Sequence, residues 1–226
     1  MEIEMKNKPL LAHAIPGIEQ VPHSFSQIAQ DFFVLACLKG LTNGRYCEIG
    51  AYHPMEISNT YILEKYYNWT GVSFDINQQS VDLFNKHRSN PAFLQDAMTA
   101  DYADYFQKAG YTDNIIDYAS VDCEPPENTL RALQQLLSSG YKFRVITFEH
   151  DTYNSTLPIK QLSRDILTAQ GYELIVGGLM GSPNFHDYED WWVHPDLVDM
   201  DHVEKFKCAE TNIFWRDYVY GAASNG

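Results

Sequence analysis

The 226-residue chain carries 16 Lys and Arg against 30 Asp and Glu residues, which gives a formal net charge of −14, and 45% of its residues are hydrophobic. This balance suits one globular domain with a full hydrophobic core. So acidic a surface repels phosphate groups, so we expect neither a nucleic acid nor a membrane surface as a partner. The four cysteines are widely spaced and no apolar run is long enough to span a bilayer, so a cytoplasmic protein is expected.

The first half of the chain alternates helical and extended patterns behind an N-terminal arm. Residues 1–22 lack periodicity and contain three prolines, so they are predicted to form an arm ahead of a single domain that covers residues 23–226. Apolar residues at helical spacing then predict helices, and short apolar runs predict strands. The predicted helices cover residues 24–40, 58–67, 78–87 and 100–110, and the predicted strands cover 45–51, 71–76, 92–97 and 114–123.

The second half continues the alternation as far as residue 180. Residues 126–140 give the clearest helical pattern, with Pro126 in the first turn, an apolar stripe along one face and Gly140 at the end. A further helix is predicted at 157–171, and strands at 142–150 and 172–180. Residues 181–210 are interpreted as a long polar and aromatic stretch, and residues 211–218 as a closing strand.

This alternation predicts a doubly wound α/β fold, with a mostly parallel sheet covered by helices on both faces and the N-terminal arm beside it. Such sheets bind their ligands beyond the carboxyl ends of the strands, at the point where the strand order reverses. The side chains that stand at the predicted strand ends are therefore the first candidates for a functional site.

Almost every predicted strand ends in an acidic residue. One such residue would be explained as a helix cap or a turn residue, but a row of them repels itself and calls for cations or hydroxyl donors. The residues concerned are Glu48, Asp75, Asp96, Asp122, Glu124 and Glu149, the last followed by His150.

Two kinds of ligand satisfy such a row of acids. A carboxylate after the second strand can accept both ribose hydroxyls of a nucleoside, and a divalent metal can use several carboxylates at once. A phosphate-rich ligand fits poorly, because the turn at Gly50 lacks the G-x-G-x-x-G pattern and no G-K-[ST] motif occurs. S-adenosylmethionine, which has a ribose and a positive sulfonium but no phosphate, suits these residues better.

Several segments resemble the FkbM-type methyltransferases, which depend on S-adenosylmethionine. "EIGAYHPMEISNTYILEKYYNWTGVSFDIN" (48–77) is similar to the first two motifs of that family, and "IIDYASVDCEPPENTLRAL" (115–133) is similar to a later one. "VITFEHD" (145–151) and "EDWWVHP" (189–195) resemble its downstream elements, so the resemblance covers residues 44–195. The chain departs from the family at Pro125, where a glycine is usual, at "FDIN" in place of Glu-Pro-Asn, and at Glu48 in place of the commoner Asp.

The resemblance implies a Rossmann-like class I methyltransferase with S-adenosylmethionine as cofactor. The turn after the first strand would contact the methionine part, and acids of the second and third strands would contact the ribose and the adenine. The implied residues are Glu48, Gly50 and Ala51 for the methionine part, Ser58, Asn59 and Thr60 for hydrogen bonds into the same pocket, Asp75 for the ribose, Asp96 and Ala97 for the adenine, and Asp122 beside the sulfonium.

Methyl transfer to a hydroxyl needs alignment and, in addition, a base or a metal that lowers the pKa of that hydroxyl. The candidates are Asp122, Glu124, Glu149 and His150. His150 titrates near neutrality, but it fits equally well as a loop histidine that caps the next turn. A metal held by Asp122, Glu124 and Glu149 is chemically reasonable but not favoured, because carboxylate spacing is a weak metal signal.

The segment "DYEDWWVHP" (187–195) is a second candidate region. Its adjacent Trp191 and Trp192 are interpreted either as a lid or sugar-stacking platform, or as an aromatic pair that packs this segment onto the sheet. One of the two is expected to pack in this way.

The leading hypothesis is an O-methyltransferase whose acceptor is a hydroxyl of a sugar or other small polar metabolite. One alternative is a metal-dependent nucleotide-sugar glycosyltransferase, because "DCE" (122–124) is an acid-x-acid pair after an apolar strand. The other is a non-catalytic scaffold that keeps the fold. The sequence leaves the acceptor, the part played by a metal and the oligomeric state open.

Overall fold

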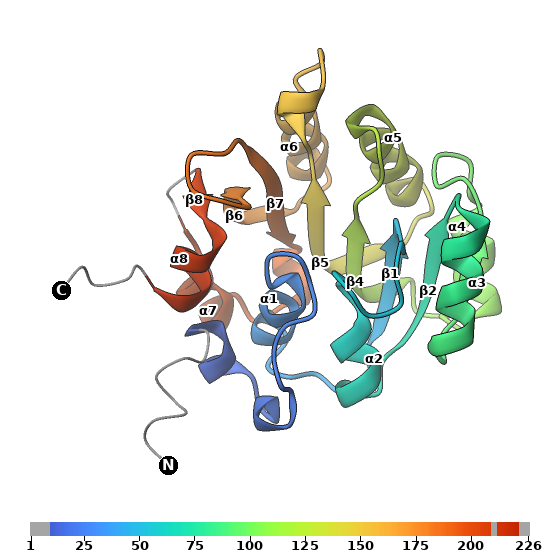
Figure 1. The fold of residues 1–226 in the computed structure, drawn as a ribbon, viewed down its shortest axis with the longest axis horizontal. Coiled ribbons are helices and arrows are strands. Elements are labelled where there is room, and N and C mark those ends of the chain that lie inside the picture. The colour runs from blue at the N-terminus through green and yellow to red at the C-terminus, as the bar shows by residue number, and fades with distance from the viewer. Residues whose placement is uncertain (1–9, 209–211, 222–226) are drawn as a thin grey trace.

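A computed structural model describes residues 10–208 and 212–221, which form one eight-stranded sheet with helices on both faces (Figure 1). The strand order is β3-β2-β1-β4-β5-β7-β6-β8, and only β7 runs antiparallel to its neighbours. This confirms the predicted doubly wound, mostly parallel sheet. The strands are β1 Arg45–Ile49, β2 Thr70–Asp75, β3 Ala92–Leu94, β4 Ile115–Val121, β5 Lys142–Glu149, β6 Glu173–Met180, β7 Asp187–Val193 and β8 Ile213–Phe214.

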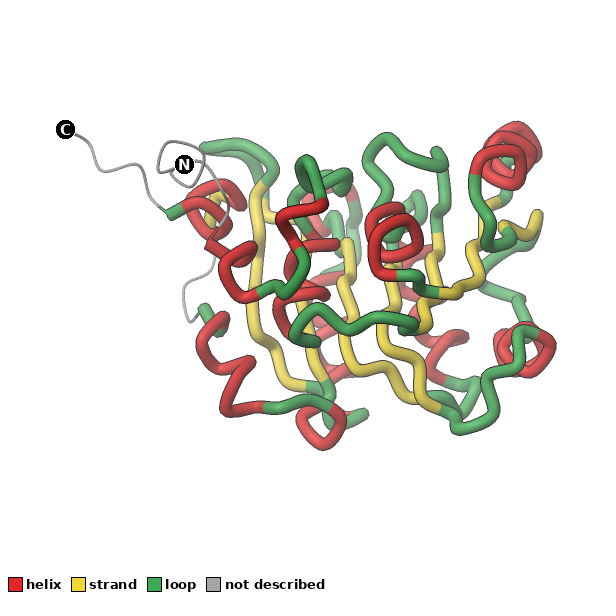
Figure 2. The backbone as a smooth tube through the Cα atoms, turned by 90° about the horizontal axis from the view of Figure 1, so that it is seen from below, coloured by secondary structure: helices red, strands yellow, loops and turns green. Residues whose placement is uncertain are grey.

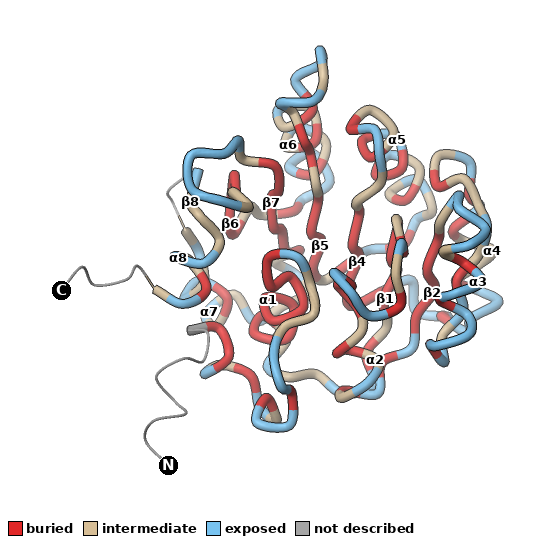
Figure 3. Tube along the Cα trace, in the orientation of Figure 1, coloured by how far each residue is buried: buried red, intermediate tan, exposed pale blue. Residues whose placement is uncertain are grey.

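Helices cover the two faces of the sheet and bury its central strands (Figures 2 and 3). On one face α1 and α2 pack over Tyr46 and Tyr118, and on the other α4, α5 and α6 pack over Ile116 and Phe143. The helices are α1 Gln30–Cys37, α2 Tyr61–Tyr67, α3 Gln78–His87, α4 Tyr102–Lys108, α5 Pro126–Leu137, α6 Ile159–Ala169, α7 Met200–Val203 and α8 Trp215–Tyr220. Among the described residues, no helix is both long and apolar enough to cross a bilayer.

The described part of the N-terminal arm is packed onto the body. Residues 10–14 and 18–20 form short 3-10 helices, and Leu11, Ile15 and Ile18 are buried in the same apolar core as α1. The Tyr67 hydroxyl fixes the segment between them by donating to the Pro16 carbonyl at 3.1 Å. Residues 1–9 of the predicted arm lie outside the described residues.

The predicted helix at 24–40 begins six residues late, at Gln30. The buried carboxylate of Asp31 accepts hydrogen bonds from the Ser24 hydroxyl at 2.6 Å and from the Phe25 backbone N–H at 2.9 Å. These bonds hold residues 24–26 in an irregular turn, because Ser and Asp side chains compete with the helix for backbone groups.

The interpretation of residues 181–210 as a polar stretch was wrong. Within it, β7 lies between β5 and β6 in the middle of the sheet, and Trp191 and Trp192 are both buried, one on each face. Neither tryptophan can act as a lid or as a sugar-stacking platform. The acidic residues of "DYEDWW" made this segment look solvent-exposed in the sequence. In the fold they belong to a strand that is covered on both faces, and residues of other elements supply their hydrogen-bond and ion-pair partners.

The closing strand predicted at 211–218 is also wrong over most of its length. Only Ile213 and Phe214 are extended, and helix α8 begins directly afterwards at Trp215. Thr211 lies outside the described residues. The aromatic residues that suggested a strand pack against the core from this short helix, as Tyr218 does against Trp191.

A buried arginine ties the loop after β1 to helices α2 and α3. The Arg88 guanidinium donates from Nε to Glu64 Oε2 at 2.8 Å, from Nη1 to the Pro54 carbonyl at 3.0 Å and from Nη2 to Thr60 Oγ1 at 3.0 Å. Burial raises the pKa of Glu48, and the positive charge of Arg88 offsets part of this rise. Arg88 therefore fixes the position of residues 52–60.

Replacing Arg88 should destabilise the fold strongly. We expect Arg88→Ala to lower the free energy of unfolding by about 3–5 kcal/mol, because it leaves the carboxylates of Glu64 and Glu48 without their buried cation. Urea denaturation would measure the change. Lys108→Ala, which breaks an exposed pair with Asp104, is the control and should change stability little. An Arg88→Ala protein as stable as this control would contradict the structural role of Arg88.

Candidate functional site

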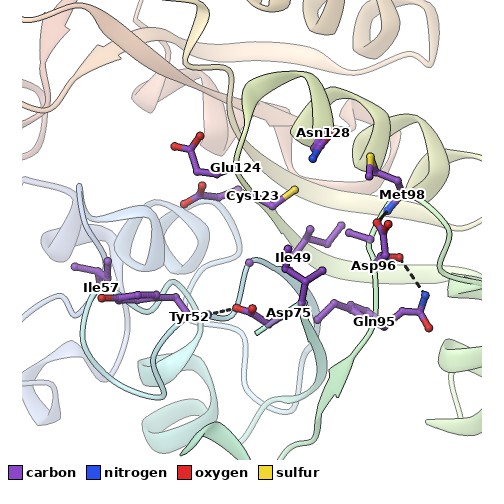
Figure 4. Close-up of a pocket in the computed structure, with 15 residues that line it drawn as sticks. Ile49, Tyr52, Ile57, Asp75, Gln95, Asp96, Met98, Cys123, Glu124 and Asn128 are labelled. Carbon is purple, nitrogen blue, oxygen red and sulfur yellow. Dashed lines mark hydrogen bonds between the residues drawn. The ribbon is translucent and has the colours of Figure 1, made fainter. Parts of the chain in front are cut away.

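A cavity of about 420 Å³ opens at the carboxyl ends of β1, β2 and β4, beside the point where the strand order reverses (Figure 4). This is where doubly wound sheets bind their ligands. Its walls are mainly apolar, and no Lys, Arg or His is among the described residues that line it. The polar side chains of the lining are Tyr52, Asp75, Gln95, Asp96, Asp122, Cys123, Glu124 and Asn128.

Gly50 forms the floor of the cavity at the end of β1. Its φ of +86° is left-handed, and a Cβ at this position would lie 1.7 Å from the Asp122 carbonyl oxygen. Only glycine allows this close approach. The turn is closed by hydrogen bonds from Gly50 N to the Phe74 carbonyl at 2.9 Å and from Asp122 N to the Ile49 carbonyl at 3.1 Å.

Asp75 stands at the carboxyl end of β2 with its carboxylate fixed by the backbone. Oδ2 accepts from the Tyr52 N–H at 2.8 Å (Figure 4). Oδ1 accepts from the Asn77 N–H at 2.7 Å. Each oxygen keeps a further lone pair, so the carboxylate can still accept hydroxyl groups of a ligand. Asn77 in turn caps α3, so Asp75 is held between a turn and a helix start.

The far end of the cavity combines one oriented acid with apolar walls. Asp96 follows β3, and its Oδ1 accepts from the Met98 N–H at 2.8 Å, which orients the carboxylate. Phe74, Ile76 and Met98 supply apolar surface beside it. Ile76 is 73% exposed, so it offers a large apolar surface at the cavity rim without a protein partner to cover it. A flat, partly polar ring fits such a site.

A second cavity of about 390 Å³ adjoins the first, and Glu124 lines both. Glu149 and Asp151, at the end of β5, form one side of it. Tyr153, Phe185 and Tyr188 form an aromatic side, and the rings of Tyr153 and Phe185 meet edge to face with centroids 5.2 Å apart. This second cavity therefore joins acidic groups to an exposed aromatic surface.

The acids between the two cavities perturb each other. Burial raises the pKa of Asp122 and of Glu149, and the negative charge of Asp122 raises the pKa of Glu149 further. Burial and the nearby Glu124 likewise raise the pKa of Asp151. Neighbouring negative charges repel each other, so these carboxyl groups do not all ionise together. They retain protons at a pH where an exposed carboxyl group has already lost its own.

The structure brings half of the sequence-predicted cofactor residues to the first cavity. Those that line it are Gly50, Asp75, Asp96, Ala97 and Asp122. The others do not line this cavity and contact other parts of the protein: Glu48 accepts from Ser73 Oγ at 2.9 Å, Ser58 and Thr60 accept from Arg88, Asn59 donates to Ser120 Oγ at 2.9 Å, and Ala51 packs near α3. Successive side chains of a strand point to opposite faces of the sheet. Because the side chain of Ile49 faces the cavity, the side chain of Glu48, which precedes it in β1, faces away from the cavity.

The structure places His150 away from both cavities. Its side chain is fully buried outside both cavities, with Nε2 3.8 Å from Asp190 and 3.9 Å from Asp187. Burial lowers the pKa of His150 to about 4, against the opposing influence of Asp190. The Thr152 N–H approaches Nδ1 at 3.5 Å, so the capping interpretation of this histidine fits the structure.

Several cavity residues escaped the sequence analysis. In the first cavity they include Tyr52, Ile57, Ile76 and Met98, and in the second they include Asp151, Tyr153, Phe185 and Tyr188. Asp151 carried a usable signal, since it also stands just after a strand. The aromatic residues carried none, because Phe185 and Tyr188 reach the cavity only through the placement of β7.

Neither a family model nor a curated protein matches the sequence. Solved structures do match. An O-methyltransferase from Bacillus cereus in complex with S-adenosylhomocysteine is 13% identical, with 81% of this chain and 88% of that chain covered and a TM-score of 0.53. The chain has a class I methyltransferase fold. The magnesium protoporphyrin IX methyltransferase of Synechocystis PCC 6803 with bound S-adenosylmethionine shares this methyltransferase fold, at 14% identity, 74% and 79% coverage and a TM-score of 0.50. At these identities the likeness shows the fold alone.

Glu189 should make stability depend on pH. Its carboxylate accepts from Trp191 Nε1 at 2.7 Å and from Gln30 Nε2 at 2.8 Å, yet burial raises its pKa to about 8, above the 4.5 of an exposed Glu. Between these values the folded state holds a proton that the unfolded state has lost. The free energy of unfolding therefore falls as pH rises, by about 1.4 kcal/mol per pH unit for this group.

Urea denaturation at pH 6, 7 and 8 would test this dependence. Glu189→Gln should give a shallower pH slope than the unchanged protein, while the exposed Glu204→Gln should keep the full slope. Part of the slope should remain in Glu189→Gln, because the pKa values of Asp122, Glu149 and Asp151 are raised as well. Equal slopes in the two variants would refute the contribution of Glu189.

Proposed function

We propose that this protein is an S-adenosylmethionine-dependent O-methyltransferase that acts on a hydroxyl of a sugar or another small polar metabolite. The observation that carries the proposal is the lining of the first cavity. Hydrogen bonds orient the carboxylates of Asp75 and Asp96 there, the walls are mainly apolar, and no basic residue is among the described lining residues. The class I methyltransferase fold and the sequence resemblance to FkbM-type methyltransferases agree with it.

The lining of the first cavity fits the chemical parts of this cofactor. Asp75 would accept the ribose hydroxyls, Asp96 would accept the adenine amino group beside Ala97, and Gly50 would let the methionine part approach the backbone. The absence of basic side chains among the described lining residues favours a ligand without phosphates. Asp122 would lie near the sulfonium, where a negative charge is favourable.

The second cavity would hold the acceptor, because it shares Glu124 with the first cavity. When bound, the cofactor supplies a methyl group that needs only a correctly aligned nucleophile. As the new carbon–oxygen bond forms and the carbon–sulfur bond breaks, the acceptor hydroxyl has to lose its proton. Glu124 lines both cavities and is the carboxylate best placed to accept that proton, with Asp122 and Glu149 beside it.

The aromatic side of the second cavity favours a sugar-like acceptor. Tyr153 is 44% exposed and Phe185 46% exposed, and the Tyr153 ring also stacks on His186. Such rings pack against the apolar face of a sugar, while carboxylates accept its hydroxyl groups. These residues take the role that the sequence had suggested for Trp191 and Trp192.

Calorimetric titration separates this proposal from its alternatives. We expect S-adenosylmethionine and S-adenosylhomocysteine to bind, and a nucleoside diphosphate sugar with Mn²⁺ not to bind. Binding of the nucleotide sugar alone would favour the glycosyltransferase alternative. Binding of neither ligand class would favour the scaffold, and either of these two results would refute the proposal.

Removing the Asp75 carboxylate should remove cofactor binding. We expect Asp75→Ala to show no measurable heat with S-adenosylhomocysteine, and Asp75→Asn to bind at least about tenfold more weakly, because a charged acceptor of buried hydroxyls is lost. Asp82→Asn is the matched control, since this exposed carboxylate on α3 contacts only Gln78. A folded Asp75→Asn protein with unchanged affinity would contradict the placement of the ribose.

A further inference from the structure

Three carboxylates converge at the junction of the two cavities. Glu124 comes from the loop after β4, Glu149 from the end of β5, and Asp151 from the residues that follow. One oxygen of each lies within 4.8 Å of an oxygen of both others. This spacing is compatible with oxygen ligands around a single small cation, since each ligand then lies roughly 2–2.6 Å from the ion.

Protein cations do not balance these charges. The two basic residues of α6 nearest in the fold are engaged elsewhere, Lys160 with Asp187 and Arg164 with Asp190 at 2.7 Å. Among the described residues, no Lys or Arg forms an ion pair with Glu124, Glu149 or Asp151. Their mutual repulsion is therefore left for protons or for a bound cation to relieve.

A buried hydroxyl at the same cavity gives an independent indication of a ligand. Tyr188 lines the second cavity, is only 5% exposed, and its hydroxyl has no hydrogen-bond partner among the described residues. The hydroxyl lies beside Gly181, which lines that cavity too. A buried O–H without an acceptor is costly, and an oxygen of a ligand in the cavity would supply the acceptor.

We propose that Glu124, Glu149 and Asp151 bind one divalent cation, Mg²⁺ or Mn²⁺, and that the Tyr188 hydroxyl donates to an oxygen bound to that cation. Hard cations of this kind prefer carboxylate oxygens and keep several water ligands. The set differs from the one that the sequence suggested, because Asp151 replaces Asp122, which lines the first cavity.

The cation would also have a chemical role. A water position of the cation that faces the second cavity can be taken by the acceptor hydroxyl, whose pKa then falls, so that its proton passes more readily to a neighbouring carboxylate. This role rests on the proposed function, whereas binding of the cation does not.

Electron paramagnetic resonance of Mn²⁺ titrated into the full chain tests the site without cofactor or acceptor. We expect one saturable site from which Mg²⁺ displaces Mn²⁺. Glu149→Gln and Asp151→Asn should each weaken binding at least about tenfold, and Tyr188→Phe about tenfold, as loss of a supporting hydrogen bond does. Asp104→Asn, a carboxylate on α4 paired with Lys108, is the control and should bind as the unchanged protein does.

Three results would overturn the cation site. They are no saturable Mn²⁺ binding by the unchanged protein, full affinity in the folded Glu149→Gln and Asp151→Asn proteins, and saturable binding of an organic ammonium ion in place of Mn²⁺. Unchanged affinity in Tyr188→Phe would overturn the part given to the hydroxyl. Titration of S-adenosylhomocysteine with EDTA present reports on the proposed function separately, so the failure of one proposal is distinguishable from the failure of the other.

Discussion

Repulsion among carboxylates at the carboxyl ends of β4 and β5 and at the adjoining amino end of the antiparallel β7 is the constraint on which this edge of the sheet depends. Asp122, Glu149 and Glu189 come from these three strands, and burial raises the pKa of each. A buried carboxylate needs a proton, a cation or donors. Stability has to come from elsewhere, and the two apolar cores on the faces of the sheet supply it.

The acidic residues near this edge of the sheet fall into two groups that differ in their charge partners. Under β1 and β2, the carboxylates of Glu48 and Glu64 have Arg88 and hydroxyl donors, so this network is complete within the protein. Beyond β4 and β5, Glu149 and Asp151 have no basic partner among the described residues. The complete network holds the loop beside the first cavity in place, whereas an incomplete one is open to a ligand. This contrast separates acids that support the fold from candidate ligand-binding acids better than their position in the sequence does.

Local patterns predicted the elements that local physics decides. The helix at 126–137 and the strands that end at Asp75 and Val121 follow from apolar spacing, and the rule that ligands bind at strand ends then led to Asp75 and Asp96, which line the first cavity. What the sequence could not show depends on partners distant in the chain. Glu48 does not line the first cavity and lies in the field of Arg88, forty residues later, and no local pattern links the two.

The sequence analysis missed strand β7 for the same physical reason. Its "DYEDWW" sequence alternates poorly and is rich in acids, which locally favours a solvated segment. In the fold Asp190 is paired with Arg164 and Glu189 accepts from Gln30, so these acids are compatible with a buried antiparallel strand. Only the tertiary partners make this strand possible, and the same strand brings Tyr188 to the second cavity.

The charge of the second cavity also restricts what can enter it. Glu124, Glu149 and Asp151 repel carboxylates and phosphates, so an acceptor with a negative group near its reacting hydroxyl would bind only through a cation between the two. A neutral sugar hydroxyl meets no such barrier, and the rings of Tyr153 and Phe185 offer it an apolar surface. Under the two proposals above, acid repulsion would select the acceptor as well as the cation, and both kinds of specificity would lie in the residues that follow β4 and β5.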